Sequence, residues 1–271
     1  MPELPEVETS RRGIKPHILN KKVTDVIIRQ KNLRWPIPSS IKKQLSGQKI
    51  QTVERRGKYI LLTTEAGTVI LHLGMSGSLR ILNKSTPPDK HDHFDIIFSN
   101  NKVLRLRDPR RFGAVLWTKK DPLKHKLLSK LGPEPLEDEF TAQYLFESSR
   151  NRKVAIKTFL MNSHIVVGVG NIYANESLFT AGINPKRLAH KISLQRYVKL
   201  VSAVKNILKR SIEQGGTTLR DFTQQDGSPG YFQQTLLVYG LTNKPCPNCG
   251  KAIKQITQAQ RSTFYCTNCQ K

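Results

Sequence analysis

The chain has 271 residues and a formal net charge of +25, from 45 Lys and Arg against 20 Asp and Glu. Its length suits two domains with a small appendage, and its 37% hydrophobic content is enough to build cores. So large a positive charge disfavours the compact state unless a polyanion neutralises it, so nucleic acid is the expected partner. A ribosome-associated basic protein is the alternative at this point.

Membrane and secreted classes are not expected. No run approaches the roughly 20 apolar residues that a membrane span needs. The acidic start, MPELPEVE, lacks the basic and apolar regions of a signal peptide, so we expect an intracellular, cytoplasmic protein. All four cysteines lie at or after position 246, which argues against a scattered disulfide framework.

The first half of the chain is predicted to be one helix followed by short strands. Glu6 and Glu8 precede Arg11 and Arg12, the charge order that suits a helix dipole, and Pro5 fits a first turn. Alternating apolar residues and turn signals then predict strands at 23–29, 49–55, 59–64, 68–73, 94–98, 103–107 and 114–118. Such short, punctuated strands indicate a β-sandwich or barrel-like domain over residues 1–133.

The second half changes to a helical period. Residues 131–139, LGPEPLEDE, are typical of an interdomain linker. Beyond it, apolar spacing predicts helices at 141–149, 154–161, 172–181 and 194–214. Residues 217–231 have the Gly, Pro and Ser content of a loop. We therefore expect three domains, 1–133, 134–236 and 237–271.

The cysteines form two CxxC pairs, and the pairs predict a zinc site. The expected ligands are Cys246, Cys249, Cys266 and Cys269. Two such pairs separated by a hairpin-length segment match one tetrahedral structural Zn²⁺, whereas a redox dithiol would not need two copies. Because four protein ligands leave no open position, the ion should fold residues 237–271 rather than perform chemistry.

The N-terminus carries a candidate nucleophile. Removal of Met1 before a small residue exposes the secondary amine of Pro2. If that amine attacks a sugar C1′ carbon, the resulting iminium ion has no N–H proton to lose and favours elimination at the neighbouring carbon. Glu3 and Glu6 place carboxyl groups beside it for proton transfer. The plainer interpretation is a common Met-Pro start followed by acids that cap a helix.

Taken together, several short motifs resemble the formamidopyrimidine-DNA glycosylase family over essentially the whole chain. They are MPELPEVE at 1–8, GKY at 57–59, HLGMSGS at 72–78, KHDH at 90–93, DPRRFG at 108–113, GVGNIY at 168–173, residues 215–221 and 226–231, and the four cysteines. The resemblance implies an α+β multidomain fold. Its parts would be an N-terminal β-sandwich with flanking helices, a helical helix-two-turn-helix domain and a C-terminal zinc-finger β-hairpin.

The resemblance also implies an activity in base-excision DNA repair. The enzyme would flip oxidised purines out of duplex DNA, excise them and nick the abasic strand by β,δ-elimination. Pro2 would be the Schiff-base nucleophile and Glu3 the acid in base release. Lys58 resembles the proton donor of β-elimination, although a surface lysine at a strand end is the alternative. Arg261 resembles the zinc-hairpin residue that grips phosphate and assists δ-elimination.

Other positions resemble the family's DNA contacts. Met75, Arg110 and Phe112 are residue types that insert into a kinked stack, and burial in the β-core is the alternative for Met75 and Phe112. Asn171, as a helix N-cap after glycines, would contact the backbone of the flipped nucleotide. The remaining contacts would be His91, Arg152 and Lys157, for which solvated charge is the alternative, and Lys157 could instead lie nearer the reaction site.

Two departures and two rival functions bear on this hypothesis. The family often has an acid where this chain has Asn162, and a retained Met1 would block the Pro2 amine. The related endonuclease VIII type prefers oxidised pyrimidines, and a non-catalytic damage sensor would lack Pro2, Glu3 or Lys58. Leu4 and the Gly-rich loop favour the purine enzyme. We expect a nucleoid-associated monomer that binds damaged double-stranded DNA and one structural Zn²⁺.

Overall fold

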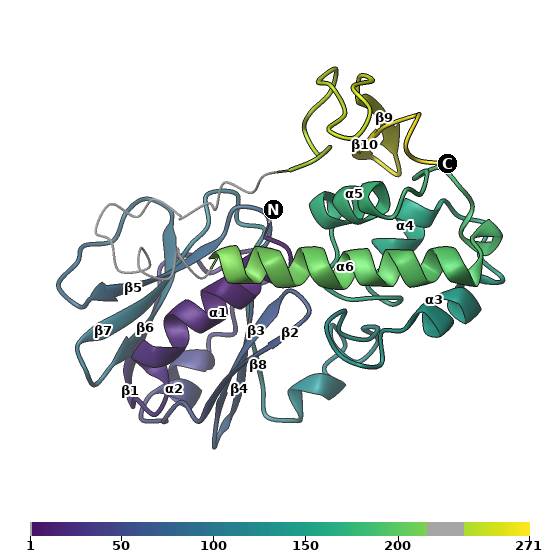
Figure 1. The fold of residues 1–271 in the computed structure, drawn as a ribbon. Coiled ribbons are helices and arrows are strands. Elements are labelled where there is room, and N and C mark those ends of the chain that lie inside the picture. Colours follow the sequence, from purple (N-terminus) through teal and green to yellow (C-terminus); the bar gives the residue numbers. More distant parts are fainter. Residues whose placement is uncertain (1, 216–235) are drawn as a thin grey trace. The chain divides into compact units, whose positions relative to one another are not determined.

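The computed structural model describes residues 2–215 and 236–271 (Figure 1). These residues form two compact units: unit 1 is 2–129 with 212–215, and unit 2 is 130–211 with 236–271. The loop predicted at 217–231 lies outside the described residues, as does Met1. Among the described helices, none has the length and apolar character that crossing a membrane requires.

Unit 1 contains the predicted β-sandwich, built from two antiparallel four-stranded sheets. Their strand orders are β1-β6-β7-β5 and β2-β3-β4-β8. The strands are β1 (Val23–Ile28), β2 (Thr52–Arg56), β3 (Tyr59–Thr64), β4 (Gly67–His72), β5 (Ser78–Asn83), β6 (Asp92–Phe98), β7 (Lys102–Arg107) and β8 (Ala114–Thr118). Side chains of both sheets share one apolar core, so the fold class expected from the sequence is confirmed.

Two helices flank this core. In α1 (Leu4–Ile18), the buried side chains Val7, Ile14 and Ile18 recur at helical spacing and join the core between the sheets. The short α2 (Ile41–Leu45) adds its two buried ends to the same core. Neither α2 nor β5 was predicted from the sequence.

Unit 2 contains the predicted helices. They are α3 (Ala142–Ser149), α4 (Ile156–Leu160), α5 (Asn171–Thr180) and α6 (Leu194–Gly215), the last of which continues into unit 1 at residues 212–215. Short 3₁₀ turns lie at Pro122–Lys124 in unit 1 and at Ala189–Lys191 in unit 2. A second apolar core joins these helices, with Tyr173 and Tyr197 fully buried. The helix predicted at 154–161 is shorter at both ends.

The cysteine-containing segment includes a two-stranded hairpin, β9 (Lys254–Gln258) and β10 (Arg261–Tyr265), which lies between the two CxxC pairs. Ala259 and Gln260 both adopt positive φ, as a tight two-residue hairpin turn requires. The chain end pairs with the segment after α5, because Lys271 N donates to Gly182 O at 3.1 Å. The hairpin and the helices therefore form one compact unit, while the division into three domains stays a prediction.

Candidate active site and nucleic-acid interface

The predicted nucleophile and acid lie at the start of α1. Pro2 is buried and Glu3 is 1% exposed. The Glu3 backbone N–H donates to Glu6 Oε2 at 2.7 Å, and Val7 N donates to Glu3 O at 3.1 Å. Glu6 therefore acts as the returning half of a capping box, which fixes the backbone that carries Pro2 and Glu3.

Glu8, to which the sequence assigned no site role, ties this helix to the neighbouring sheet. Its carboxylate accepts hydrogen bonds from Arg11 and Arg12 on α1 and, at 3.1 Å, from Arg55 on β2. Burial opposes its ionisation, but these bonds and the charges of Arg11 and Arg55 outweigh burial and lower the pKa of Glu8 to about 2. Arg55 also donates to Gly57 O at 3.0 Å, so the bond between Glu8 and Arg55 helps to orient the turn that holds Lys58.

Lys58 is half-buried in the β2–β3 turn, where Gly57 has a φ of +57°. Nearby, the His72 ring stacks obliquely on Tyr59 with ring centroids 4.8 Å apart. Burial, reinforced by the charges of Arg34 and Lys58, lowers the pKa of His72 to about 4. The imidazole is therefore neutral at pH 7, and its Nδ1 accepts a hydrogen bond from Gly74 N at 3.0 Å.

Gly74 opens the loop that carries Met75, and this loop lies against the DPRRFG loop. Phe112 is 45% exposed, so the alternative of burial in the β-core is wrong for this residue. The Arg110 guanidinium lies 4.8 Å from the centre of the Phe112 ring, while Met75 is half-buried. A planar cation and an aromatic ring are thus exposed together on the loop that joins β7 and β8.

The start of α5 differs by one residue from the prediction. Gly170 is the N-cap, and Asn171 is the first helical residue, so the assignment of Asn171 as N-cap is wrong. Its side chain is 8% exposed and donates from Nδ2 to Ser262 O at 3.0 Å. Asn171 therefore orients the hairpin strand that begins at Arg261.

Lys157 is also directed into the protein. It is 1% exposed, and its Nζ donates to Ser262 O at 2.8 Å and to Thr263 Oγ1 at 2.7 Å. The interpretation of Lys157 as a solvated charge is wrong, and its contact with DNA stays a prediction. With Asn171, it holds the residue that follows Arg261.

A cavity of about 360 Å³ lies in unit 2 between α4 and the hairpin turn. Arg152 and Arg261 line it with exposed guanidinium groups, and Lys157 lies at its wall. The described lining includes no acidic residue, so the cavity favours an anion such as a phosphate.

Asn162, at the position where the family often has an acid, also lines this cavity. Its Oδ1 accepts a hydrogen bond from His164 N at 3.0 Å, a role that does not require a carboxylate.

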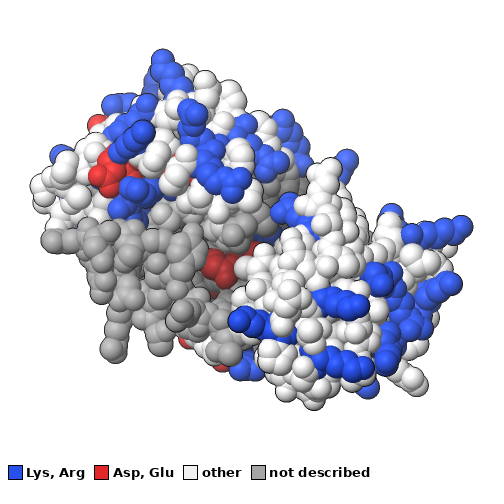
Figure 2. Space-filling view, turned by 90° about the horizontal axis from the view of Figure 1, so that it is seen from above, with Lys and Arg blue, Asp and Glu red and all other residues white. Residues whose placement is uncertain are grey.

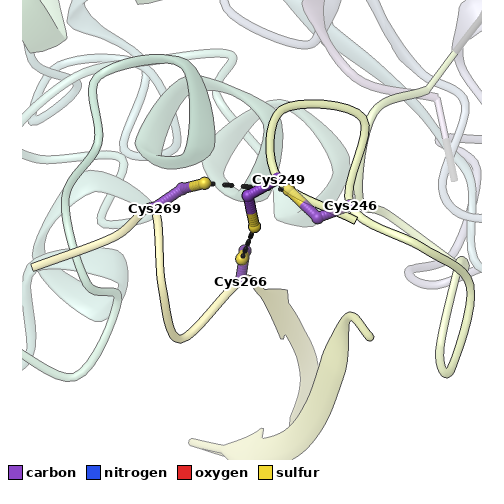
Figure 3. A group of neighbouring side chains, drawn as sticks. All are labelled: Cys246, Cys249, Cys266 and Cys269. Atoms are coloured by element: carbon purple, nitrogen blue, oxygen red, sulfur yellow. Dashed lines mark hydrogen bonds between the residues drawn. The ribbon is translucent and has the colours of Figure 1, made fainter. Parts of the chain in front are cut away.

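The four cysteines lie together, as Figure 3 shows. The Sγ atoms of Cys246 and Cys269 are 3.8 Å apart, and those of Cys249 and Cys266 are 3.5 Å apart. Zn–S bonds of about 2.3 Å in a tetrahedron require sulfur separations of roughly 3.8 Å. The arrangement therefore fits one Zn²⁺ held by four thiolates, with no position left for a substrate.

Lys and Arg side chains are spread over the face that Figure 2 shows. On the face in Figure 2, Lys and Arg side chains far outnumber those of Asp and Glu among the described residues. His91 is half-buried just before β6 in unit 1, whereas Arg261 belongs to unit 2. The approach of Arg261 to Pro2 therefore stays a prediction.

Comparison with known proteins agrees with this geometry. Family models match residues 1–115 (formamidopyrimidine-DNA glycosylase N-terminal domain), 131–223 (its H2TH domain) and 243–271 (a zinc finger found in FPG and IleRS). The formamidopyrimidine-DNA glycosylase of Cellvibrio japonicus is 58% identical to this chain, and that of a Stenotrophomonas maltophilia strain is 57% identical. Each alignment covers 100% of this chain and 100% of the relative. The chain belongs to the formamidopyrimidine-DNA glycosylase family.

Solved structures of formamidopyrimidine-DNA glycosylases support the same assignment. A structure of MutM in complex with DNA that contains carbocyclic 8-oxo-G has a TM-score of 0.90 and 34% identity, with 99% of both chains covered. The MutM (Fpg) protein of Thermus thermophilus has a TM-score of 0.85 and 34% identity, covering 99% of this chain and 98% of that one. The chain is thus a base-excision repair glycosylase with a structural zinc site, as the sequence predicted.

Proposed function

We propose that this glycosylase excises oxidised purines, 8-oxoguanine and formamidopyrimidines, from duplex DNA and then cleaves the abasic strand. The main support is the Pro2–Glu3 pair at the buried, capped start of α1. A mutant Lactococcus lactis Fpg in complex with DNA that contains Fapy-dG adds support, with a TM-score of 0.90 and 33% identity over 99% of both chains. The proposal requires that Met1 be removed, because the nucleophile is the Pro2 amine.

The proposed base release and strand cleavage both depend on the secondary amine of Pro2. The Pro2 nitrogen lone pair forms a bond to C1′ while the bond from C1′ to the base breaks, and Glu3 supplies the proton in base release. The Pro2 nitrogen then loses its proton, and the bond from C1′ to the ring oxygen O4′ breaks as O4′ gains a proton, which opens the sugar and leaves an iminium ion. Loss of a C2′ proton sends its electron pair towards the iminium carbon, and the 3′ phosphate departs. A second elimination releases the 5′ phosphate and leaves a one-nucleotide gap. Lys58 serves the first elimination as proton donor and Arg261 assists the second.

The remaining predicted residues hold the DNA. Met75, Arg110 and Phe112 form a wedge that fills the space left by the flipped base. His91, Arg152 and Lys157 contact the DNA, and Asn171 contacts the backbone of the flipped nucleotide. Asn171 and Lys157 also support the hairpin that presents Arg261. We assign catalysis to residues 1–133, DNA grip to 134–236 and zinc binding to 237–271, in a nucleoid-associated monomer.

Borohydride trapping tests the nucleophile. Wild-type protein mixed with an 8-oxoguanine duplex and borohydride should give a covalent protein–DNA adduct whose protein end is Pro2. Pro2→Gly should trap far more slowly, whereas Pro16→Ala, at the other end of α1, serves as the matched control. If Pro2→Gly traps at the wild-type rate, the assignment of Pro2 is wrong.

Two further assays address the rival functions. A duplex with thymine glycol, competed against one with 8-oxoguanine, separates the purine enzyme from the endonuclease VIII type. Strand nicking of an abasic duplex by the wild-type protein separates an enzyme from a damage sensor. Preference for thymine glycol, or absence of nicking, would contradict the proposal.

A further inference from the structure

The two loops of the proposed wedge run side by side between the sheets. Residues 73–77 lead from β4 in one sheet to β5 in the other, and residues 108–113 lead back from β7 to β8. Strand pairs enclose them at both ends, because His72 pairs with Ala114 and Ser78 with Arg107. Both loops therefore depend on the same two sheets.

Asp108 joins these loops through its side chain. It is 0% exposed, and its Oδ1 accepts a hydrogen bond from Ser76 Oγ at 2.7 Å. Its Oδ2 accepts one from Gly113 N, also at 2.7 Å. Ser76 Oγ in turn accepts a hydrogen bond from Arg110 N at 3.2 Å. One buried carboxylate thus orients the residue after Met75 and the residue after Phe112.

Close backbone packing also restricts the two loops at this point. A Cβ on Gly74 would lie 2.4 Å from the Phe112 carbonyl carbon, so only glycine allows this approach. The Asp108 backbone also holds the strand that follows His91, since Asp108 N donates to His91 O at 3.0 Å and His93 Nε2 lies 2.9 Å from Asp108 O.

We infer that Asp108 is a positioning residue that, through Ser76, holds Met75, Arg110 and Phe112 as one pre-organised wedge for duplex DNA. The inference rests on the proposed function of this site. A wedge that is already ordered loses little conformational entropy when it enters the stack, whereas two separate loops would have to be ordered during insertion. Charge-assisted hydrogen bonds in a buried setting are suited to that constraint.

Ser76 provides the sharpest test. Ser76→Ala removes the donor to Asp108 and the acceptor for Arg110 N, and Ser76→Thr keeps a hydroxyl. Ser78→Ala, two residues further on in β5, is the matched control. Each variant is given an 8-oxoguanine duplex, which requires insertion, and a single-stranded abasic oligonucleotide, which has no partner strand to displace. A 2-aminopurine beside the lesion reports base-stack disruption by fluorescence.

Loss of one charge-assisted hydrogen bond predicts that Ser76→Ala slows duplex excision and the fluorescence rise by roughly 10-fold or more. Borohydride trapping on the single strand and the unfolding temperature should stay near wild type, and Ser76→Thr should restore insertion. Asp108→Asn should slow insertion in the same way, which provides a second, independent variant.

Two results would overturn the inference. One is that Ser76→Ala inserts its wedge into the duplex at the wild-type rate. The other is that Ser76→Ala loses duplex excision, single-strand trapping and thermal stability to the same extent, which would indicate a general structural role. Failure of the proposed function is visible separately, because the wild-type protein itself would then neither excise 8-oxoguanine nor trap.

Discussion

Glu176 Oε1 accepts a hydrogen bond from Val238 N at 3.0 Å, which ties the middle of α5 to the segment that leads into the zinc site. The same carboxylate accepts hydrogen bonds from Leu237 N and Tyr239 N at 2.8 Å each, and Glu176 is only 4% exposed. A buried carboxylate that accepts three backbone donors replaces water for all three. The Glu176 carboxylate therefore fixes the entry of the zinc segment on α5, in addition to the bonds that α5 makes to β10.

Replacing this carboxylate should loosen the entry segment. Glu176→Gln has one acceptor oxygen and adds an NH₂ group that faces backbone donors, so we expect a loss of about 1–3 kcal/mol in the free energy of unfolding. Amide hydrogen exchange should rise at residues 236–241. Glu213→Gln, an exposed acid on α6, is the control. Unchanged exchange in Glu176→Gln would show that the three bonds do not hold the segment.

Lys157 should support the hairpin that presents Arg261. Lys157→Met keeps the length of the side chain but leaves Ser262 O and Thr263 Oγ1 without this donor, at a cost of about 1–3 kcal/mol. We expect faster hydrogen exchange in β10 and weaker DNA binding. Lys153→Met removes the same charge from an exposed position and serves as control. Equal loss of DNA binding in both variants would favour a simple charge effect.

Zinc should be necessary for the hairpin and for tight DNA binding. Cys266→Ser removes one of four ligands, so native mass spectrometry should find one zinc ion in the wild type and none in the variant. Hydrogen exchange should rise over residues 242–271, with a smaller rise at α5, because Asn175 Oδ1 accepts from Phe264 N at 2.7 Å. Asn268→Ala, in the same turn, is the control. Full DNA binding by Cys266→Ser would show that the hairpin is dispensable.

Glu8 should stabilise the fold in a pH-dependent way. Its pKa is lowered from 4.5 to about 2, so the stabilisation is fully present above pH 4.5 and is lost as the pH falls towards 2. The shift corresponds to at most about 3 kcal/mol, and solvent screening of the partly exposed arginines reduces the loss expected for Glu8→Gln at pH 7 to about 2 kcal/mol. Denaturant unfolding of the wild type and of Glu8→Gln at pH 7 and pH 3 measures the difference in their free energies of unfolding. The exposed Glu65→Gln is the control. If the wild type were more stable than Glu8→Gln by the same amount at both pH values, the stabilisation would not arise from the lowered pKa of Glu8.

Several features were predictable because they depend on neighbouring residues. Strand and helix periods and the CxxC spacing are local patterns, and most predicted elements lie within a few residues of the observed ones. β5 was missed because only Leu79 and Ile81 of its side chains are fully buried, and its pattern is interrupted by charge. The short α2 spans too few residues for a period to be recognised.

The roles of buried polar side chains were not predictable in this way. Lys157 and Thr263 are 106 positions apart, and Ser76 and Asp108 are 32 apart, so no local pattern relates them. In the sequence, Lys157 and Asn171 are simply polar residues near basic or glycine-rich motifs. That both are buried and support the hairpin depends on how α4, α5 and β10 pack together.

By itself, therefore, the sequence determined the family, the four zinc ligands, the candidate Pro2 nucleophile and the positive charge that selects a polyanion. Those properties reside in residue identity and spacing, which folding does not alter. Only the tertiary structure decided that Glu8 links α1 to β2, that Phe112 is exposed and that Asp108 joins the two wedge loops. Burial and hydrogen-bond partners arise when distant segments pack, and they determine whether a charged side chain binds a ligand or holds the protein together.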